Sequence, residues 1–206
     1  MKVKIQEVEF SQKRRYYSNE LKGKSKILVA LHGYGQLAQF FSRKFAVLDQ
    51  AYGLIMPEGP HRFYLEGSSG RVGASWMTKE WREQDIEENT RYLLALIEKV
   101  KAENAAASIY LLGFSQGGAT AARLYQSSPD LFETLILWAS VFPPDVTVQD
   151  FDQVGTLHFA IGNQDPYFLE AQKEDVLQTY RNLGFKIHEF EGKHDIDPTT
   201  LSKILQ

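Results

Sequence analysis

Two hydrophobic patterns alternate along the chain. Continuous apolar runs, which are typical of strands buried in a parallel sheet, occupy residues 27–31, 109–112, 134–138 and 157–161. Stretches with apolar side chains at helical spacing lie between these runs, and residues 82–101 form the clearest of them. Because strand and helix alternate from residue 27 to the C-terminus, the pattern predicts an α/β fold with one mostly parallel central sheet and helices on both faces.

Two regions fall outside this alternation. Residues 2–9 alternate polar and apolar side chains, so we expect a half-exposed strand there that forms an N-terminal antiparallel hairpin with the stretch around Tyr16 and Tyr17. Residues 57–81 show no clear period and are rich in glycine, serine and aromatic side chains. An aperiodic segment of this length in a compact domain is more often functional than decorative, although the sequence does not indicate its role.

Composition and charge exclude several classes of protein. A length of 206 residues favours one domain, which would span 1–206. With 23 basic and 26 acidic residues the net charge is −3. The only basic cluster is the short run of residues 13–15, so the sequence does not indicate binding of nucleic acid. Cysteine is absent, which excludes disulfides, thiolate metal sites and a cysteine nucleophile. No apolar stretch has the length of a signal peptide or membrane span, so we expect a cytoplasmic protein.

The most informative stretch is 108–125, where an apolar run, a sharp turn and a helix of small residues follow one another. Ser115 stands in the turn, with Gly113 and Gly117 two residues away on either side. Such glycines permit a strained strand-to-helix turn that lifts the serine hydroxyl clear of the sheet. The start of the helix directs unpaired N–H groups at negative charge nearby, as acyl transfer requires. The motif alone also fits ordinary packing, so the rest of the chain has to decide.

A serine nucleophile needs a histidine base and a carboxylate that orients the histidine. Of the five histidines, His194 lies in a loop after the last predicted strand, whereas His158 and His188 lie inside strands. Asp165 also follows a predicted strand, so it should reach the same edge of the sheet. Asp195 is too close in sequence to orient its neighbour's ring. The sequence therefore predicts Asp165 as the acid and His194 as the base.

Two backbone N–H groups are expected to stabilise the negative charge that develops on the acyl oxygen. Gln116, directly after the serine, supplies one of them. The loop 32–35 after the first buried strand supplies the other, with Tyr34 as the donor, because glycines on both sides let its backbone approach a substrate. This chemistry requires no cofactor and no metal.

The chain order serine, aspartate, histidine is the order of the α/β-hydrolase fold. The chain also resembles a known family in four segments around these residues: Leu31 to Gly35, Gly113 to Gly118, Gly162 with Asp165, and Gly192 to Ile196. These segments resemble the motifs of the phospholipase/carboxylesterase family of small α/β-hydrolases, which includes the acyl-protein thioesterases. The resemblance implies that Ser115, Asp165 and His194 form the catalytic triad, with Tyr34 and Gln116 as the oxyanion donors.

The resemblance also has departures. The family usually carries glutamate after the catalytic histidine and Val-Pro after the aspartate region, where this chain has Asp195 and then Tyr167 with Phe168. These positions neighbour the pocket, so the departures concern the substrate more than the catalysis. The expected substrate-binding residues are aromatic side chains in loops at the catalytic edge: Trp76, which resembles the family's tryptophan before the long helix, Phe142, Tyr167 and Phe168.

No helical insertion of the size of a lipase lid is visible in the sequence. We therefore expect a serine esterase that acts on short soluble acyl esters or thioesters, a small-molecule substrate. The sequence does not indicate an oligomeric state.

Two alternatives stay open from the sequence. Residues 33–38 fit the dinucleotide-binding pattern G-x-G-x-x-A between strand and helix, and Glu58 follows 20 residues after Ala38, where an acid that binds ribose would stand (58 − 38 = 20). That function would leave the serine, aspartate and histidine unexplained. The other alternative is a non-catalytic binder of small molecules on the same fold, since a fold does not fix a function.

Overall fold

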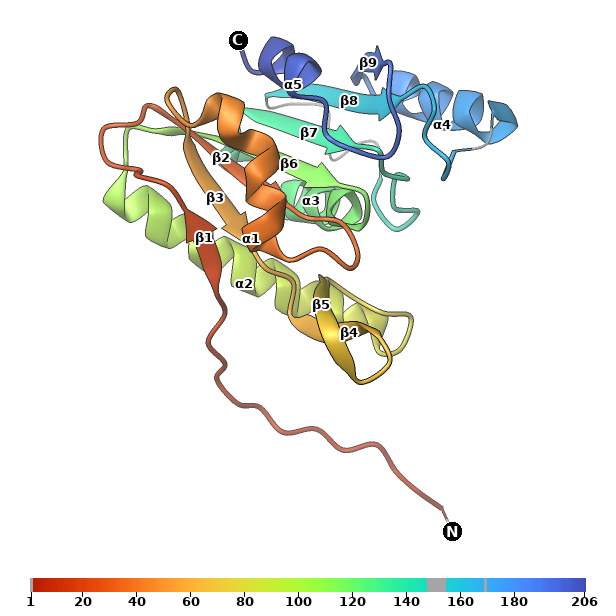
Figure 1. The fold of residues 1–206 in the computed structure, drawn as a ribbon. Helices are drawn as coiled ribbons and strands as arrows, with labels where there is room; N and C mark the ends of the chain where they lie inside the picture. The colour runs from red at the N-terminus through yellow and green to blue at the C-terminus, as the bar shows by residue number, and fades with distance from the viewer. Residues whose placement is uncertain (1, 148–154, 169) are drawn as a thin grey trace.

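Seven strands form one sheet, and six of them run parallel (Figure 1). The computed structural model describes residues 2–147, 155–168 and 170–206. Across the sheet the strands follow the order β1 (Tyr16–Ser18), β3 (Gly53–Pro57), β2 (Lys26–Leu31), β6 (Ser108–Phe114), β7 (Thr134–Trp138), β8 (Thr156–Gly162) and β9 (Lys186–Phe190). Only β1 pairs antiparallel with its neighbour. The predicted, mostly parallel sheet is confirmed.

Helices cover both faces of this sheet (Figure 1). One face carries α1 (Ala38–Phe41), the 3-10 helix η1 (Ser42–Leu48) and α5 (Pro198–Ile204), and the other carries α2 (Arg82–Glu103) and α3 (Gln116–Ser127). The helix α4 (Glu170–Asn182) packs beside β9, and the 3-10 turn η2 (Pro129–Leu131) precedes β7. None of the helices in the described part of the chain combines the length and apolar character that a membrane span requires.

The register of the central strands brings their carboxyl ends to one edge. Strand β2 has no exposed surface from Ile27 to Leu31, because it lies between β3 and β6 with both faces covered, which explains its unbroken apolar sequence. Leu31 at its end pairs with Gly113, and Phe114 pairs with Trp138. The loops after β2, β6, β7, β8 and β9 therefore meet at the same edge of the sheet.

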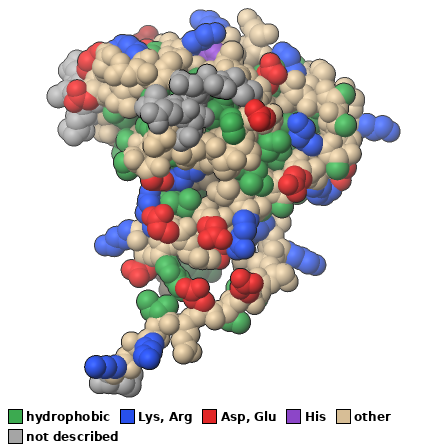
Figure 2. Space-filling model, turned by 180° about the vertical axis from the view of Figure 1, so that it is seen from behind, with side chains coloured by type: hydrophobic (Ala, Val, Ile, Leu, Met, Phe, Trp, Pro, Cys, Tyr) green, Lys and Arg blue, Asp and Glu red, His purple; other side chains and the backbone are tan. Residues whose placement is uncertain are grey.

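The predicted N-terminal hairpin is wrong. Residues 2–15 contain no strand, and β1 pairs with β3 instead, with Tyr16 opposite Pro57. The apolar side chains of the segment, Val3, Ile5, Val8 and Phe10, are 77% to 86% exposed, and Figure 2 shows it projecting from the body of the molecule. The reason lies in the sequence: the first two apolar residues are odd-numbered and the last two even-numbered, so a strand here would have no continuous apolar face to bury.

The segment 57–81 contains a second sheet that the sequence pattern did not reveal. Strands β4 (His61–Glu66) and β5 (Ser69–Ser75) form an antiparallel hairpin, and positive φ angles occur at Gly67 in its turn (58°) and at Gly70 near the start of β5 (86°). The hairpin is largely exposed on β4, so burial imposes no alternation on its sequence. An isolated bridge between Gln36 and Ala74 attaches β5 to the loop after β2.

Candidate active site

Ser115 occupies a strained turn between β6 and α3. Its backbone angles are φ 54° and ψ −119°, a region that costs a non-glycine residue about 1–3 kcal/mol. The flanking glycines are required by close contact: a Cβ on Gly113 would lie 2.4 Å from the carbonyl oxygen of Gly117, and a Cβ on Gly117 would lie 2.4 Å from that of Leu31. The turn thus forms only with this arrangement of glycines around the serine.

Asp165 and His194 are joined by a hydrogen bond across two loops. His194 Nδ1 lies 2.7 Å from Asp165 Oδ2, and the other carboxylate oxygen accepts a hydrogen bond from the backbone N–H of Tyr167 at 2.9 Å. The Asp165 side chain is only 1% exposed, whereas the His194 side chain is 17% exposed. Because a buried carboxylate needs partners, this pair fixes both the position of the imidazole and the nitrogen that carries its proton.

The serine, aspartate and histidine loops lie against one another. The Phe114 ring, next to Ser115 in the chain, packs against the His194 imidazole with 4.8 Å between ring centroids. A Cβ on Gly162, at the start of the aspartate loop, would lie 2.3 Å from the carbonyl oxygen of Gly192 in the histidine loop. The structure thus brings Asp165 and His194 into direct contact and places Phe114, the chain neighbour of Ser115, against the His194 ring.

The loop after β2 leaves one backbone N–H free among four. Gly33 donates to the side chain of Gln36 at 3.0 Å, Gly35 donates to Ala74 at 2.9 Å, and Gln36 donates back to Gly33 at 3.2 Å. Within the described residues, the N–H of Tyr34 has no acceptor in the protein. The loop packs closely on the serine, since a Cβ on Gly33 would lie 3.2 Å from the Cβ of Ser115.

Gln116, the first residue of α3, has a role for its side chain that the sequence did not reveal. Its amide oxygen accepts from the backbone N–H of Trp76 at 3.0 Å, and its amide nitrogen donates to the carbonyl of Met77 at 2.9 Å. It also exchanges hydrogen bonds with the Ser75 hydroxyl. The side chain therefore ties the serine turn to the end of β5. Its own N–H, at the first position of the helix, has no protein acceptor in the described part of the chain.

The other four histidines have structural partners. His32 is fully buried: its Nε2 accepts from the N–H of Gly59 at 2.9 Å, so its Nδ1 donates to the carbonyl of Gly33, and burial lowers its pKa. His61 lies 2.9 Å from Asp85.

His158 and His188 lie on neighbouring strands, with 2.8 Å between their facing ring nitrogens. Burial, with the neighbouring His188 and Lys186 as further causes, lowers the pKa of His158 from 6.5 to about 4. Within residues 2–147, 155–168 and 170–206, no three acidic or histidine side chains are grouped closely enough to hold a metal ion.

The four predicted substrate-binding residues are spread over different surroundings. Trp76 has no exposed surface, and its indole N–H donates to the carbonyl of His32 at 2.8 Å. Phe142 packs against Phe185, which lies just before β9. The loop that carries His194 follows the other end of this strand, so this contact of Phe142 is with the end of β9 away from His194.

The remaining two candidates belong to the aspartate loop. Phe168 is nearly buried, while Tyr167 is 73% exposed and sets its ring edge-on to His194 at 4.5 Å between centroids. Tyr167 is thus the one of the four that combines an exposed surface with contact to the site.

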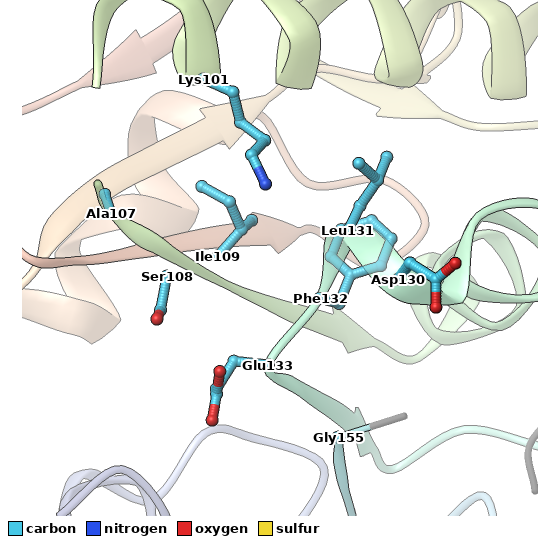
Figure 3. A pocket seen from close by; sticks show the side chains of 9 residues that line it. All are labelled: Lys101, Ala107, Ser108, Ile109, Asp130, Leu131, Phe132, Glu133 and Gly155. Atoms are coloured by element: carbon cyan, nitrogen blue, oxygen red, sulfur yellow. The ribbon is translucent and has the colours of Figure 1, made fainter. Parts of the chain in front are cut away.

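A cavity of about 240 Å³ lies at the opposite edge of the sheet (Figure 3). Ser108 and Ile109 at the start of β6, Glu133 before β7 and Gly155 before β8 line it, and the Lys101 side chain extends into it from α2. Because these residues precede their strands while the serine, aspartate and histidine follow theirs, this cavity is separate from the candidate active site.

The structure contradicts the dinucleotide-binding alternative. Glu58, the residue that would bind ribose, is buried, and its carboxylate accepts a hydrogen bond from Arg15 at 2.7 Å with Arg62 at 3.5 Å. The helix after the glycine loop has only four α-helical residues before it tightens into a 3-10 helix, so it offers a weak dipole to a pyrophosphate. The glycines instead allow the loop to approach Ser115 and β5.

Comparisons with known proteins identify the family and the fold. The sequence profile of a family described as Phospholipase/Carboxylesterase matches residues 18–206. The fold is similar to the crystal structure of esterase PE8, with a TM-score of 0.73 and 18% identity over 94% of this chain and 96% of that one.

Two further structures are also similar. A Bacillus cereus carboxylesterase gives a TM-score of 0.65 at 19% identity over 93% of this chain and 91% of that one. Zea mays acyl-protein thioesterase 2 gives 0.65 at 17% identity over 92% and 95%. At these identities the likeness concerns the fold alone. A search of curated proteins found no match to the sequence.

Proposed function

Because the chain belongs to the phospholipase/carboxylesterase family and has the α/β-hydrolase fold, we propose that it is a serine carboxylesterase that hydrolyses short acyl esters or thioesters through an acyl-enzyme at Ser115. The observation that carries the proposal is the 2.7 Å hydrogen bond between the buried Asp165 and His194, at the sheet edge where Ser115 stands in its strained turn. A carboxylate that holds Nδ1–H leaves Nε2 unprotonated, which is the form a general base needs.

In the first half of the reaction, Ser115 Oγ attacks the acyl carbonyl carbon while His194 Nε2 takes the hydroxyl proton. Negative charge passes to the acyl oxygen, and the free N–H groups of Tyr34 and Gln116 donate to it. The positive end of the α3 dipole favours the same charge. The tetrahedral intermediate collapses, and the alcohol or thiol leaves with the proton from His194. The acyl group is then bound to Ser115 as an ester.

In the second half, water replaces the alcohol. His194 removes a proton from the water, which attacks the acyl-enzyme, and the same oxyanion donors stabilise the second intermediate. Collapse returns the proton to Ser115 and releases the carboxylic acid. Asp165 keeps its charge throughout and stabilises the imidazolium that forms twice.

We propose Tyr167 as the first residue to contact the acyl or leaving group, because its exposed ring touches His194. Trp76, Phe142 and Phe168 support the neighbouring loops from more buried positions, and they would meet a substrate only after a rearrangement. A single catalytic domain over 1–206 and a cytoplasmic location remain predictions.

The decisive experiment is intact-mass spectrometry after exposure to a fluorophosphonate, with Ser115→Ala as the matched control. We expect one covalent adduct on the wild type and none on the variant. Turnover is then measured with p-nitrophenyl esters whose acyl chains have about two to eight carbons. A folded wild-type protein that forms no adduct would contradict the esterase and favour a non-catalytic binder on the same fold.

A further inference from the structure

Trp138, at the end of β7, connects the serine turn with the histidine loop. Its carbonyl accepts a hydrogen bond from the backbone N–H of Ser115 at 2.8 Å. Its indole Nε1–H donates to the carbonyl of Asp195 at 2.9 Å, and Asp195 is the residue directly after His194. One side chain and its own backbone thus hold both segments, which are 79 residues apart in the sequence (194 − 115 = 79). The side chain has no exposed surface, so its position is fixed by the surrounding core.

The other contacts of the histidine loop hold different parts of it. Gln164 donates to the carbonyl of Gly192 at 2.8 Å, which secures the loop two residues before His194. Lys44 forms an ion pair with the Asp195 carboxylate, but the aspartate side chain is 58% exposed, and exposed pairs contribute about 0–1 kcal/mol. Directly after His194, the hydrogen bond from the buried indole of Trp138 is therefore the contact that ties the backbone to the central sheet.

Resting on the proposed function, we propose that Trp138 is a positioning residue that sets the separation between the Ser115 hydroxyl and the His194 imidazole. The Asp165 hydrogen bond fixes the orientation of the imidazole. The distance of the histidine loop from Ser115 depends instead on the backbone contacts of the loop. Trp138 accepts the hydrogen bond from the Ser115 N–H and also holds the histidine loop through its indole. The positions of the two reacting groups therefore both depend on this one residue. A misplacement of about 1 Å costs on the order of 10² in rate.

The bond should affect activity more than stability. Asp195 is an exposed residue and its bond to the indole is only partly buried, so we expect water to take the place of the indole N–H as donor to its carbonyl. The folded state then loses little, while the loop loses the contact that fixes it relative to Ser115. A residue that only supported the core would show the opposite balance.

The test replaces Trp138 with phenylalanine and, by site-specific incorporation, with 3-benzothienylalanine, which keeps the shape of the indole but has sulfur in place of N–H. Tyr52→Phe is the matched control, because it removes another buried side-chain hydrogen bond, from Tyr52 to the carbonyl of Leu205 at 2.6 Å, away from the site. We expect both Trp138 variants to lower kcat and the rate of fluorophosphonate labelling by about tenfold or more, with KM within about twofold of wild type. The control should stay within about twofold in both constants.

Each outcome of the test either supports or overturns the proposal. Wild-type kcat in the benzothienylalanine variant would overturn the proposal, and this variant also decides if Trp138→Phe fails to fold. A loss shared by Tyr52→Phe, or a rise in KM equal to the fall in kcat/KM, would assign the effect to general destabilisation or to binding and would equally overturn it. Failure of the wild type to form an adduct on Ser115 would overturn the esterase itself, which separates the two proposals.

Discussion

Replacing Asp165 with asparagine should remove nearly all turnover while it preserves the fold. In the native protein one carboxylate oxygen accepts from the N–H of Tyr167 at 2.9 Å and the other faces His194 Nδ1 at 2.7 Å. In the variant, the amide oxygen keeps the bond to Tyr167, because only an acceptor fits there. The amide NH₂ must then face His194, so Nδ1 becomes the acceptor and the proton moves to Nε2, the atom that has to accept the serine proton.

The magnitude follows from this reversal of the tautomer. The same change in a serine protease triad lowers kcat by about 10⁴, which corresponds to about 5.5 kcal/mol in the barrier. Asparagine has nearly the same volume as aspartate, so the structural cost is limited to one charge-assisted hydrogen bond, about 1.5–3 kcal/mol of unfolding free energy. The effect on the rate therefore exceeds the effect on stability.

The assay compares kcat for a p-nitrophenyl ester among wild type, Asp165→Asn and Ser115→Ala, with urea unfolding of each variant. Asp175→Asn is the matched control, since it makes the same chemical change on an exposed position of α4 and should leave kcat unaltered. If Asp165→Asn retained more than about one hundredth of the wild-type kcat, the carboxylate would not control the tautomer and the reasoning would fail.

Three further changes test other parts of the structure. Gln116→Ala leaves the N–H of Trp76 without an acceptor and removes one of the two donors to the carbonyl of Met77, so urea unfolding should show a loss of about 1–3 kcal/mol; an unchanged midpoint would contradict the role of the side chain. Gly117→Ala places a Cβ 2.4 Å from a backbone carbonyl oxygen of β2, so labelling by a fluorophosphonate should be lost, and normal labelling would contradict the tight turn. The pKa of His158 is lowered by burial from 6.5 to about 4, so the unfolded state binds more protons between these values and stability should fall as the pH drops through that range. Thermal unfolding of His158→Gln should show a flatter decline, and an identical decline would refute this.

The sequence was informative where a local requirement leaves a local trace. The buried strands are continuous apolar runs because both of their faces are covered, and the serine turn needs glycines at fixed positions because backbone approaches within 2.4 Å. The loops after the strands meet because parallel strands end at one edge. For these reasons the sheet and the proximity of Asp165 to His194 could be expected before the structure was known.

Elements without a buried face left no such trace. The β4–β5 hairpin forms a sheet of its own and is largely exposed on β4, so its sequence carries no period. Residues 2–9 do alternate, yet their apolar positions change face midway, and the prediction of a strand overlooked this.

Long-range hydrogen bonds were equally invisible. The indole of Trp138 reaches a carbonyl 57 residues away, and the Gln116 side chain reaches the end of β5 about 40 residues away. Trp76 was expected to bind substrate because it lies in a predicted loop at the catalytic edge and resembles the family's tryptophan before the long helix; the hydrogen bonds of both its N–H groups and its carbonyl could not be predicted. Nothing in the local pattern indicates these partners, and the substrate-binding role of Trp76 stays a prediction.

The strained backbone at Ser115 makes stability and function favour different residues at this position. Glycine adopts a φ of 54° without steric cost, so it would relieve the turn and lower the energy of the folded state. A lineage under selection for thermal stability alone would drift toward glycine at this position and lose the hydroxyl in one step. The serine is therefore a position where evolution of a more robust protein and evolution of a working one lead in opposite directions.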